Sequence, residues 1–406
     1  MTSSGDGNAV QVNSPAFTDV AGNTTAGAAV TKTYKIDTVA PSVGNPVLSG
    51  TEGDNGWYKS AVTASFTASD ATSGVAGTNP KTVTSTQQGT GIELSSPAFS
   101  DNAGNTTAAG NKSTTVKVDS LAPNAPTATV NPAPNGAGWN NDDLIVSFTA
   151  NGDGALGSGV ASCTDDVPVT AETAAAGRIV TGTCTDRAGN TSEATAVTVK
   201  LDKTSPVVSL SGGPSDTTKY YFGTVPAAPT CGASDATPGS GLADADGVAP
   251  GLQDCVVAGY RTSVGTHTVQ ATATDNAGNR TTVSRTYTVG AWTSKGFYSP
   301  VDMNGIYNVV KGGSTVPLKF ELFAGTTELT DVSAVDTFLT QKINCDGTLP
   351  SDLVEVTTTG GTSLRYDATG GQFIQNWKTP TGAGTCYKTT MTADDGSAIS
   401  ALFKIK

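Results

Sequence analysis

The chain has 406 residues, which leaves room for about three or four domains of ordinary size. Its formal net charge is −12 and it has no cluster of lysine or arginine, so we expect no nucleic acid and no anionic membrane surface as a partner. No apolar run approaches the length that spans a bilayer, which excludes direct membrane insertion. The opening residues have neither a basic nor an apolar signal region, so we expect no export signal in this chain.

The most regular segments of the chain alternate between apolar and polar residues. Residues 62–68 and 269–273 are clear examples, and such alternation is typical of strands with one buried face. No window keeps the spacing of an amphipathic helix over three turns. The predicted fold class is therefore all-β.

Three motifs recur in the same order along the chain. The first is D-x-A-G-N, whose aspartates are 82, 85 and 89 residues apart. The second is D-x-x-x-P, repeated after 82 and 83 residues, and the third is a glycine-containing turn after an apolar strand. Such a period indicates tandem copies of one module. In motif order, the copies are Asp19, Asp101, Asp186 and Asp275; Asp37, Asp119 and Asp202; and the turns at 69–75, 154–160 and 234–242.

Each motif suits a β-sandwich. In D-x-A-G-N the Asp can accept backbone hydrogen bonds, while Gly and Asn tolerate positive φ, so the motif predicts a hairpin turn. The proline of D-x-x-x-P cannot donate to a ladder and so ends the last strand of a module. About seven short strands in each period predict tandem immunoglobulin-like β-sandwich modules. The linkers between them are too short for the modules to tumble independently, so we expect an elongated chain.

These motifs set the expected domain boundaries. Residues 37–118, 119–201 and 202–290 form three immunoglobulin-like repeats, and residues 291–406 form a different last module. Residues 1–36 hold only the last turn and strand of a preceding repeat, which cannot bury a core alone. We therefore expect the chain to be the C-terminal part of something longer, or its start to be misassigned.

Aligning the repeats on the D-x-A-G-N aspartate predicts core positions. Two residues before this aspartate stand Phe17, Phe99, Cys184 and Ala273, and the alternation places them inward. Near the third motif, Phe66 of one copy is matched by Cys231 of another. Cysteines thus replace core phenylalanines.

The six cysteines fall in pairs inside single modules. We expect structural disulfides, each contributing about 3–4 kcal/mol in the chain-entropy model. Free buried thiols and a metal site are the alternatives, although no C-x-x-C spacing favours a metal. Disulfides persist outside the cytoplasm, which predicts an extracellular or cell-surface location. The pairs are Cys163 with Cys184, Cys231 with Cys255, and Cys345 with Cys386.

Two family resemblances follow from the motifs. The repeats, with Gly56-Trp57-Tyr58 or Gly138-Trp139 before an alternating strand and with residues 265–279, resemble bacterial Ig-like repeats of secreted and surface proteins. Residues 295–406 resemble the PxKF domain, found at the ends of secreted proteins, chiefly of actinobacteria. This resemblance is carried by the segments 296–302, 312–320 with Pro317-Leu-Lys-Phe320, 376–378 and 384–386. It implies no established activity.

For the residues that could be catalytic, the sequence indicates structural roles. His267, the only histidine, stands at the start of a strand with no sign of a partnered nucleophile, so we expect an exposed strand residue. The seven glutamates are scattered singly, which does not favour a catalytic pair. We therefore predict no enzyme, no catalytic or cofactor-binding residue and no cofactor.

Metal binding is a further alternative. The junction aspartates Asp37, Asp119 and Asp202 could hold calcium between modules, although we expect hydrogen-bonded turn carboxylates without a metal. Asp244-Ala-Asp246-Gly247 is similar to part of a calcium loop but lacks its other ligands.

Aromatic residues concentrate in the last module. They could form an exposed row that stacks on sugar rings, but we expect them to build the core. The residues concerned include Phe297, Tyr298, Tyr307, Tyr366, Trp377 and Tyr387.

The predicted function is that of a non-catalytic extracellular structural or interaction protein, a rigid spacer with an adhesive role. Cell-wall polysaccharide or a ligand on a host or neighbouring surface is the expected partner. Two alternatives stay open: an accessory C-terminal region of an extracellular hydrolase, and a phage decoration or fibre protein.

Overall fold

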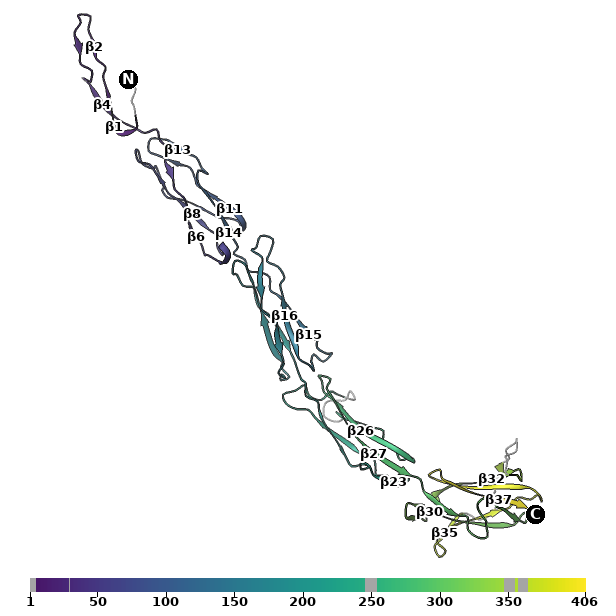
Figure 1. Ribbon diagram of the computed structural model, residues 1–406. Helices are drawn as coiled ribbons and strands as arrows, with labels where there is room; N and C mark the ends of the chain where they lie inside the picture. The colour runs from purple at the N-terminus through teal and green to yellow at the C-terminus, as the bar shows by residue number, and fades with distance from the viewer. Residues whose placement is uncertain (1–4, 29, 245–253, 347–354, 357–363) are drawn as a thin grey trace. The chain divides into compact units, whose positions relative to one another are not determined.

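The computed structural model describes residues 5–28, 30–244, 254–346, 355–356 and 364–406, and its regular structure there is almost entirely β-strand (Figure 1). The other elements are two short 3-10 turns, η1 (Asp54–Gly56) and η2 (Val332–Ala334). This confirms the all-β prediction. The chain divides into two units, Met1–Asp202 and Lys203–Lys406.

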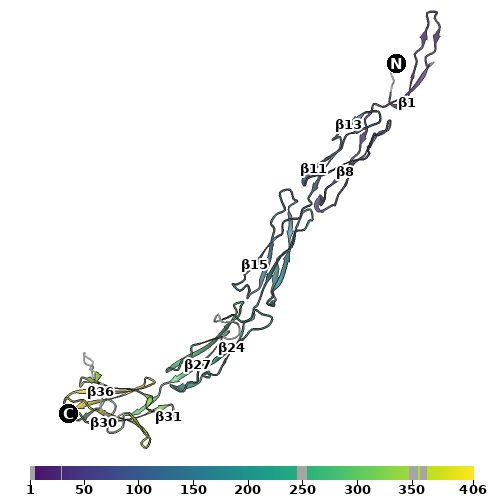
Figure 2. The same ribbon diagram turned by 180° about the vertical axis from the view of Figure 1, so that it is seen from behind.

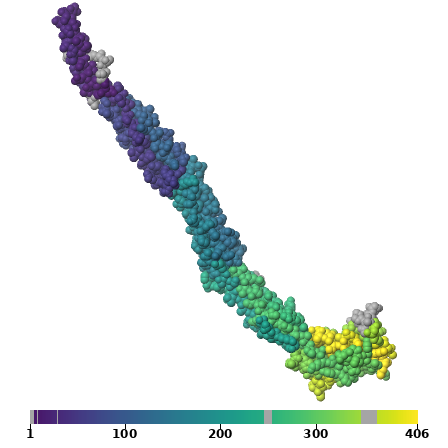
Figure 3. Space-filling model, viewed as in Figure 1, coloured from purple at the N-terminus to yellow at the C-terminus, as the bar shows by residue number. Residues whose placement is uncertain are grey.

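The first unit begins with a two-stranded ribbon, drawn at the N-terminal end in Figure 2 and seen as the narrow purple end of the space-filling view in Figure 3. Strand β1 (Gly7–Asn13) pairs antiparallel with β4 (Thr31–Ile36), and β2 (Phe17–Thr18) pairs with β3 (Thr24–Thr25). Its apolar side chains face solvent, since Phe17 is 63% exposed and Tyr34 is 48% exposed.

Residues 37–118 form a sandwich around Phe66 and Phe99, both fully buried. One sheet has the order β10-β8-β6 and the other the order β11-β14-β7, while β5 pairs with β9 and β12 with β13. The strands are β5 (Ser42–Val43), β6 (Val47–Ser49), β7 (Trp57–Tyr58), β8 (Thr63–Phe66), β9 (Ala68–Ser69), β10 (Lys81–Thr84), β11 (Gly89–Ser95), β12 (Phe99–Ser100), β13 (Thr106–Thr107) and β14 (Ser113–Val118).

Residues 119–201 repeat this plan around Leu144, Val146 and Val169. The sheet β15-β16-β18, whose first two strands run side by side in Figure 1, is completed by the pairs β17-β20 and β19-β21. The strands are β15 (Thr127–Asn131), β16 (Leu144–Thr149), β17 (Val160–Cys163), β18 (Val167–Val169), β19 (Arg178–Gly182), β20 (Cys184–Asp186) and β21 (Thr195–Val199).

The second unit begins with the third repeat, whose sheets have the orders β22-β24 and β23-β27-β26-β25. Val269 and Ala271, in the alternating run noted in the sequence, are fully buried on β26. The strands are β22 (Val207–Ser211), β23 (Lys219–Tyr221), β24 (Thr230–Ser234), β25 (Val256–Ala258), β26 (Gly265–Thr274) and β27 (Arg280–Gly290).

The last module has two larger sheets, β28-β30-β35-β34 with β31 at its edge, and β29-β37-β36-β32-β33. Its core is aromatic, with Phe320, Phe373 and Phe403 fully buried. The strands are β28 (Thr293–Gly296), β29 (Tyr307–Val310), β30 (Thr315–Ala324), β31 (Thr327–Leu329), β32 (Val335–Ile343), β33 (Glu355–Val356), β34 (Arg365–Asp367), β35 (Gln372–Lys378), β36 (Cys386–Ala393) and β37 (Ala398–Ile405).

A parallel pairing recurs in these modules. The last strand runs parallel to a short early strand, as β14 does to β7, β27 to β23 and β37 to β29. In residues 119–201 the same connection is a single parallel bridge between Asn140 and Leu201. Each module is thus closed by hydrogen bonds between its beginning and its end.

The predicted inward positions are buried where a sandwich surrounds them. Phe99 and Cys184 are fully buried and Ala273 is 2% exposed, while Cys231 is partly buried against the core. Phe17 is the exception, because no second sheet among the described residues covers the N-terminal ribbon. Within the described part of the chain, no helix is long and apolar enough to cross a membrane.

Candidate functional site

The D-x-A-G-N motif forms the hairpin that the sequence predicts. In the copy at Asp101, the Asp101 amide donates to the Asn105 carbonyl, and Oδ1 of Asp101 accepts the amides of Ala103 and Asn105, each at 2.8 Å. Gly104 has φ 97°, which explains why glycine stands there. The Asn105 side chain then donates to Oδ2 of Asp101 and to the carbonyl of Asp37, 3.1 Å away. The turn therefore ties one motif to another.

The three motifs meet at one end of the sandwich in residues 37–118. Asp37, Asp70 and Asp101 each place a carboxylate oxygen within 4.8 Å of the others. Backbone amides support them: Oδ1 of Asp70 accepts those of Thr72, Ser73 and Gly74, at 3.1, 2.8 and 2.8 Å. Oδ2 of Asp37 also accepts the Ser73 amide, at 3.0 Å. A pocket of about 320 Å³ opens beside Asp37 and Ser73.

The same convergence is more deeply buried in residues 119–201. Asp119, Asp153 and Asp186 bring carboxylate oxygens within 4.8 Å of one another, and they are 0%, 9% and 2% exposed. The Ser158 amide donates to Oδ2 of Asp119 at 2.6 Å, and the Gly159 amide donates to Oδ2 of Asp153 at 2.7 Å. We call this set the second-repeat aspartate triad.

One oxygen of this triad lacks a partner. Oδ1 of Asp153 is buried and has no hydrogen-bond partner in the structure. Burial raises the pKa of Asp153; the bond from the Gly159 amide opposes this shift, whereas the charges of Asp119 and Asp186 add to it. By contrast, the pKa of the exposed Asp19, in the N-terminal ribbon, is lowered, chiefly by its bond from the Asn23 side chain. The same turn motif thus sits in two electrostatic environments.

The loop over Asp153 depends on a glycine. A Cβ on Gly157 would lie 2.0 Å from the Asp153 carbonyl oxygen and 2.5 Å from its Oδ2. No other residue fits there without moving the Asp153 backbone, so Gly157 lets the loop fold back against this carboxylate.

The junction aspartates expected from the sequence are hydrogen-bonded in turns. Oδ1 of Asp37 accepts the Val39 amide at 3.1 Å, and Oδ1 of Asp119 accepts the Leu121 amide at 3.2 Å. Asp202 is fully buried at the end of the first unit, and its amide donates to the Asn140 carbonyl at 3.0 Å. In the third repeat, Asp235 and Asp275 occupy the matching motif positions. Of the calcium-like segment at 244–247, residues 245–247 lie outside the described residues.

Each of the six cysteines is joined to the neighbour named in the sequence analysis. Cys163 pairs with Cys184 across β17 and β20, where the two residues stand directly opposite. Cys231 is joined to Cys255 and Cys345 to Cys386. Cys184, Cys255 and Cys386 are the buried members, at 0%, 7% and 1% exposure.

His267 lies on strand β26, as expected, but it is half-buried rather than exposed. The centre of its ring is 5.7 Å from that of Tyr287, and its Nε2 is 2.6 Å from the Ser263 carbonyl oxygen. The register explains the difference, because β26 pairs His267 with the fully packed Tyr287 of β27.

Two glutamates of the last module are less scattered than their sequence positions indicate. Glu321 on β30 and Glu328 on β31 both raise the pKa of Tyr298 and Tyr366; for Tyr298 burial is the largest cause, and for Tyr366 it is the bond to Glu328. The Tyr366 hydroxyl donates to Oε1 of Glu328 at 2.7 Å. Lys295 places its Nζ 3.8 Å from Oε2 of Glu321. Glu328 therefore accepts a hydrogen bond and Glu321 forms an ion pair, both within the sheet that contains β30 and β31.

The aromatic residues of the last module mostly build its core. Trp377 is 2% exposed and donates from Nε1 to Oγ1 of Thr340 at 2.9 Å, and its ring centre is 4.4 Å from that of Phe403. Phe297 and Tyr387 are also buried. Tyr298, Tyr307 and Tyr366 are half-buried, so none of the candidate residues for a sugar platform is fully exposed.

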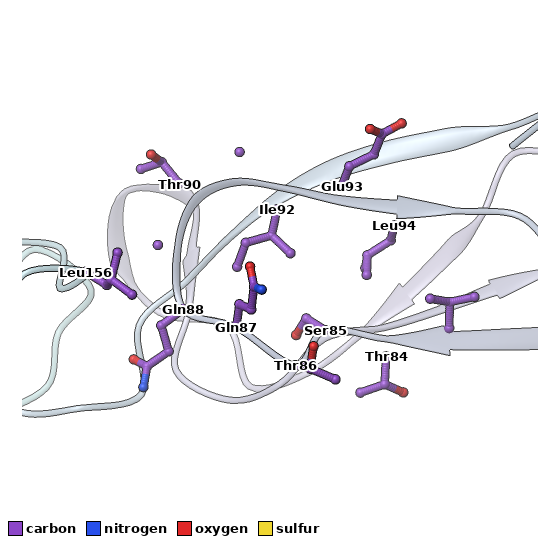
Figure 4. A pocket seen from close by; sticks show the side chains of 13 residues that line it. Thr84, Ser85, Thr86, Gln87, Gln88, Thr90, Ile92, Glu93, Leu94 and Leu156 are labelled. Carbon is purple, nitrogen blue, oxygen red and sulfur yellow. The ribbon is translucent and has the colours of Figure 1, made fainter.

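A groove in the first unit has a volume of about 900 Å³ (Figure 4). It is lined by residues 83–94 and by Leu156, which is 63% exposed. Glu93 is the one charged side chain in this lining, and the other polar residues are threonine, serine and glutamine. The groove therefore gathers no acid-base pair and no set of metal ligands.

No family model matches the chain. No curated protein matches it either. Among the solved structures that are similar over much of its length are the following three. The three N-terminal domains of the outer capsid protein Hoc of bacteriophage RB49 are 11% identical and cover 70% of this chain and 98% of their own, with a TM-score of 0.29. A Ca²⁺-stabilised adhesin that helps an Antarctic bacterium bind ice is 18% identical over 90% of this chain and 99% of its own, with a TM-score of 0.27.

The third is a tetra-tandem repeat from the extending region of a large adhesion protein. It is 14% identical over 90% of this chain and 100% of its own, with a TM-score of 0.24. Scores this low carry no argument about function. The resemblance of residues 291–406 to the PxKF domain stays a prediction.

Sequence reasoning missed the second-repeat triad because it assigned its carboxylates to separate motifs and did not bring them together. It named Asp119 as a junction residue and Asp186 as a turn residue, but not Asp153, which precedes the turn at 154–160. The signal was present: Asp70, Asp153 and Asp235 each stand five or seven residues before the apolar residue that ends the third motif.

Proposed function

We propose that this chain is a non-catalytic extracellular spacer, built from immunoglobulin-like modules and ending in a module with an adhesive role. The disulfides support an oxidising compartment, because such bonds do not persist in a reducing cytosol. The candidate carboxylates are hydrogen-bonded in turns and most of the candidate aromatic rings are packed in the core, which supports structural roles for both groups.

The observation that carries this proposal is the direct bonding between consecutive modules in the first unit. The amide of Asp54 donates to the Ala188 carbonyl at 3.0 Å, and Nδ2 of Asn55 donates to the Arg187 carbonyl at 2.9 Å. A Cβ on Gly53 would lie 2.3 Å from the same Ala188 oxygen, so this approach requires glycine. A linker backed by such bonds resists bending, which is the property a spacer needs.

Small-angle X-ray scattering of the whole chain tests the spacer. We expect an elongated particle, and a broader distribution of shapes for Gly53→Leu, which blocks the approach to Ala188. Gly56→Leu is the control in the same turn, because no atom lies within 4 Å of its Cβ position; its φ of 75° adds a backbone strain that Gly53, with a φ of −118°, does not have. A compact particle, or equal broadening by both variants, contradicts the proposal.

For the adhesive role we propose cell-wall polysaccharide, or a ligand on a host or neighbouring surface, as the partner of residues 291–406. Sedimentation of the chain with isolated cell-wall polysaccharide tests it, with the same chain truncated before residue 291 as the control. Equal binding by both forms would show that the adhesive site lies outside residues 291–406.

Two other functions keep the same fold: an accessory region of an extracellular hydrolase and a phage decoration or fibre protein. Sequencing the genomic region around the gene for this chain distinguishes them. A catalytic domain encoded in the same reading frame favours the first, and neighbouring virion genes favour the second.

A further inference from the structure

We propose that Asp119, Asp153 and Asp186 bind one divalent cation, of the calcium type, inside the second repeat. This goes beyond the spacer function, because it makes the stability of one module depend on an ion. Three independent features of the site carry it: the spacing of the oxygens, an unpartnered buried oxygen and, among the described residues, the lack of an ion pair to these carboxylates.

The spacing fits calcium. Carboxylate oxygens bind Ca²⁺ at about 2.3–2.6 Å, so two oxygens on opposite sides of the ion are at most about 4.6–5.2 Å apart. One oxygen from each of the three aspartates lies within 4.8 Å of the others. Mg²⁺, with bonds of about 2.0–2.1 Å, needs oxygens within about 4.2 Å and favours rigid octahedral geometry. The site can therefore close on calcium with little movement of its backbone.

The unpartnered oxygen belongs to Asp153, whose other oxygen is hydrogen-bonded. Asp153 is 9% exposed, and while its Oδ2 accepts the Gly159 amide, its Oδ1 is buried with no hydrogen-bond partner. A buried polar atom without a partner is costly and calls for an explanation such as an ion. A cation among the three carboxylates supplies the missing interaction.

The charges of the triad are not balanced by protein. Within the described residues, no lysine or arginine forms an ion pair with Asp119, Asp153 or Asp186. Hydrogen bonds from backbone amides and from Asn190 orient the oxygens but carry no full charge. Three carboxylates this close repel one another in a buried site, and a divalent ion relieves that repulsion. Oxygen-only ligands select a hard cation over zinc or copper.

The first repeat offers a natural comparison. Asp37, Asp70 and Asp101 have the same mutual spacing, but Asp70 directs one oxygen at three backbone amides, and among the described residues none of these three carboxylates has a buried oxygen without a partner. The N-terminal ribbon offers a second comparison, because Asp19 forms the same turn as Asp186 but is exposed and outside any such triad.

The test is calorimetric titration of the whole chain, stripped with EDTA, with CaCl₂ and separately with MgCl₂. We expect saturable calcium binding whose stoichiometry falls by one ion per chain in Asp153→Asn and in Asp186→Asn. Asp19→Asn, the matched control, should keep the stoichiometry of the unsubstituted chain. Absence of calcium binding, or an unchanged stoichiometry in Asp153→Asn, overturns the proposal.

Thermal unfolding separates ion binding from simple turn stabilisation. Asparagine at 153 keeps an oxygen for the Gly159 amide and removes one negative charge. We therefore expect Asp153→Asn to unfold at a higher temperature than the unsubstituted chain in EDTA and at a lower temperature in calcium. A hydrogen-bonded turn carboxylate with no ion would give the same order of melting temperatures in both buffers, and that result also overturns the proposal.

Discussion

Replacement of Trp377 by alanine tests whether the aromatic residues of the last module are core or binding surface. Trp377 is 2% exposed, and it contacts Phe403 and the Thr340 hydroxyl. Removal of a buried tryptophan costs about 3–5 kcal/mol of unfolding free energy. The buried Thr340 hydroxyl keeps a second partner, Thr389, whose Oγ1 is 3.3 Å away, so the loss adds no unpartnered group.

For a module of this size, that loss lowers the melting temperature by roughly 12–20 °C. The assay is differential scanning calorimetry of the whole chain, following the transition that moves in the variant. Val309→Ala is the matched control, because Val309 lies in the same module and is 56% exposed, and it should change stability by less than about 0.5 kcal/mol. An unchanged melting temperature in Trp377→Ala together with lost polysaccharide binding would refute the core assignment.

Two further predictions follow from matched positions in the repeats. Phe99→Ala should destabilise the chain by about 3–5 kcal/mol, whereas Phe17→Ala, at the same motif position but 63% exposed, should cost less than about 0.5 kcal/mol; chemical denaturation of both measures this, and equal effects would contradict the burial pattern. Peptide mapping without reductant should recover Cys163–Cys184, Cys231–Cys255 and Cys345–Cys386 and no free thiol. Pairing between modules would be evidence against the disulfide assignment.

The sequence was sufficient to predict the strands and turns because their causes are local. Alternation placed Phe66, Phe99 and Val269 inward, and each is fully buried. The D-x-A-G-N motif needs only hydrogen bonds within five residues, together with a glycine at positive φ, so its hairpin could be deduced without tertiary information.

The aspartate triads could not be predicted in this way. Asp119, Asp153 and Asp186 are separated by more than 30 residues, and they meet only because the sandwich brings three loops to one end. Similarly, Glu321 and Glu328 approach the same tyrosines only after β31 folds back on β30, and His267 is covered only by the register of β26 with β27. Each of these outcomes depends on strand pairing, which alternation alone does not specify.

The parallel closing strands have a mechanical consequence. Because β7 runs parallel to β14, β23 to β27 and β29 to β37, tension that reaches both strands of such a pair, after the strands before the early partner have been released, pulls them in opposite directions along their length. The hydrogen bonds between them are then loaded in shear, all at once, rather than opened one after another like a zipper. Forced unfolding is governed by the unfolding rate, and breaking these hydrogen bonds together raises the activation barrier that sets this rate when the chain is stretched.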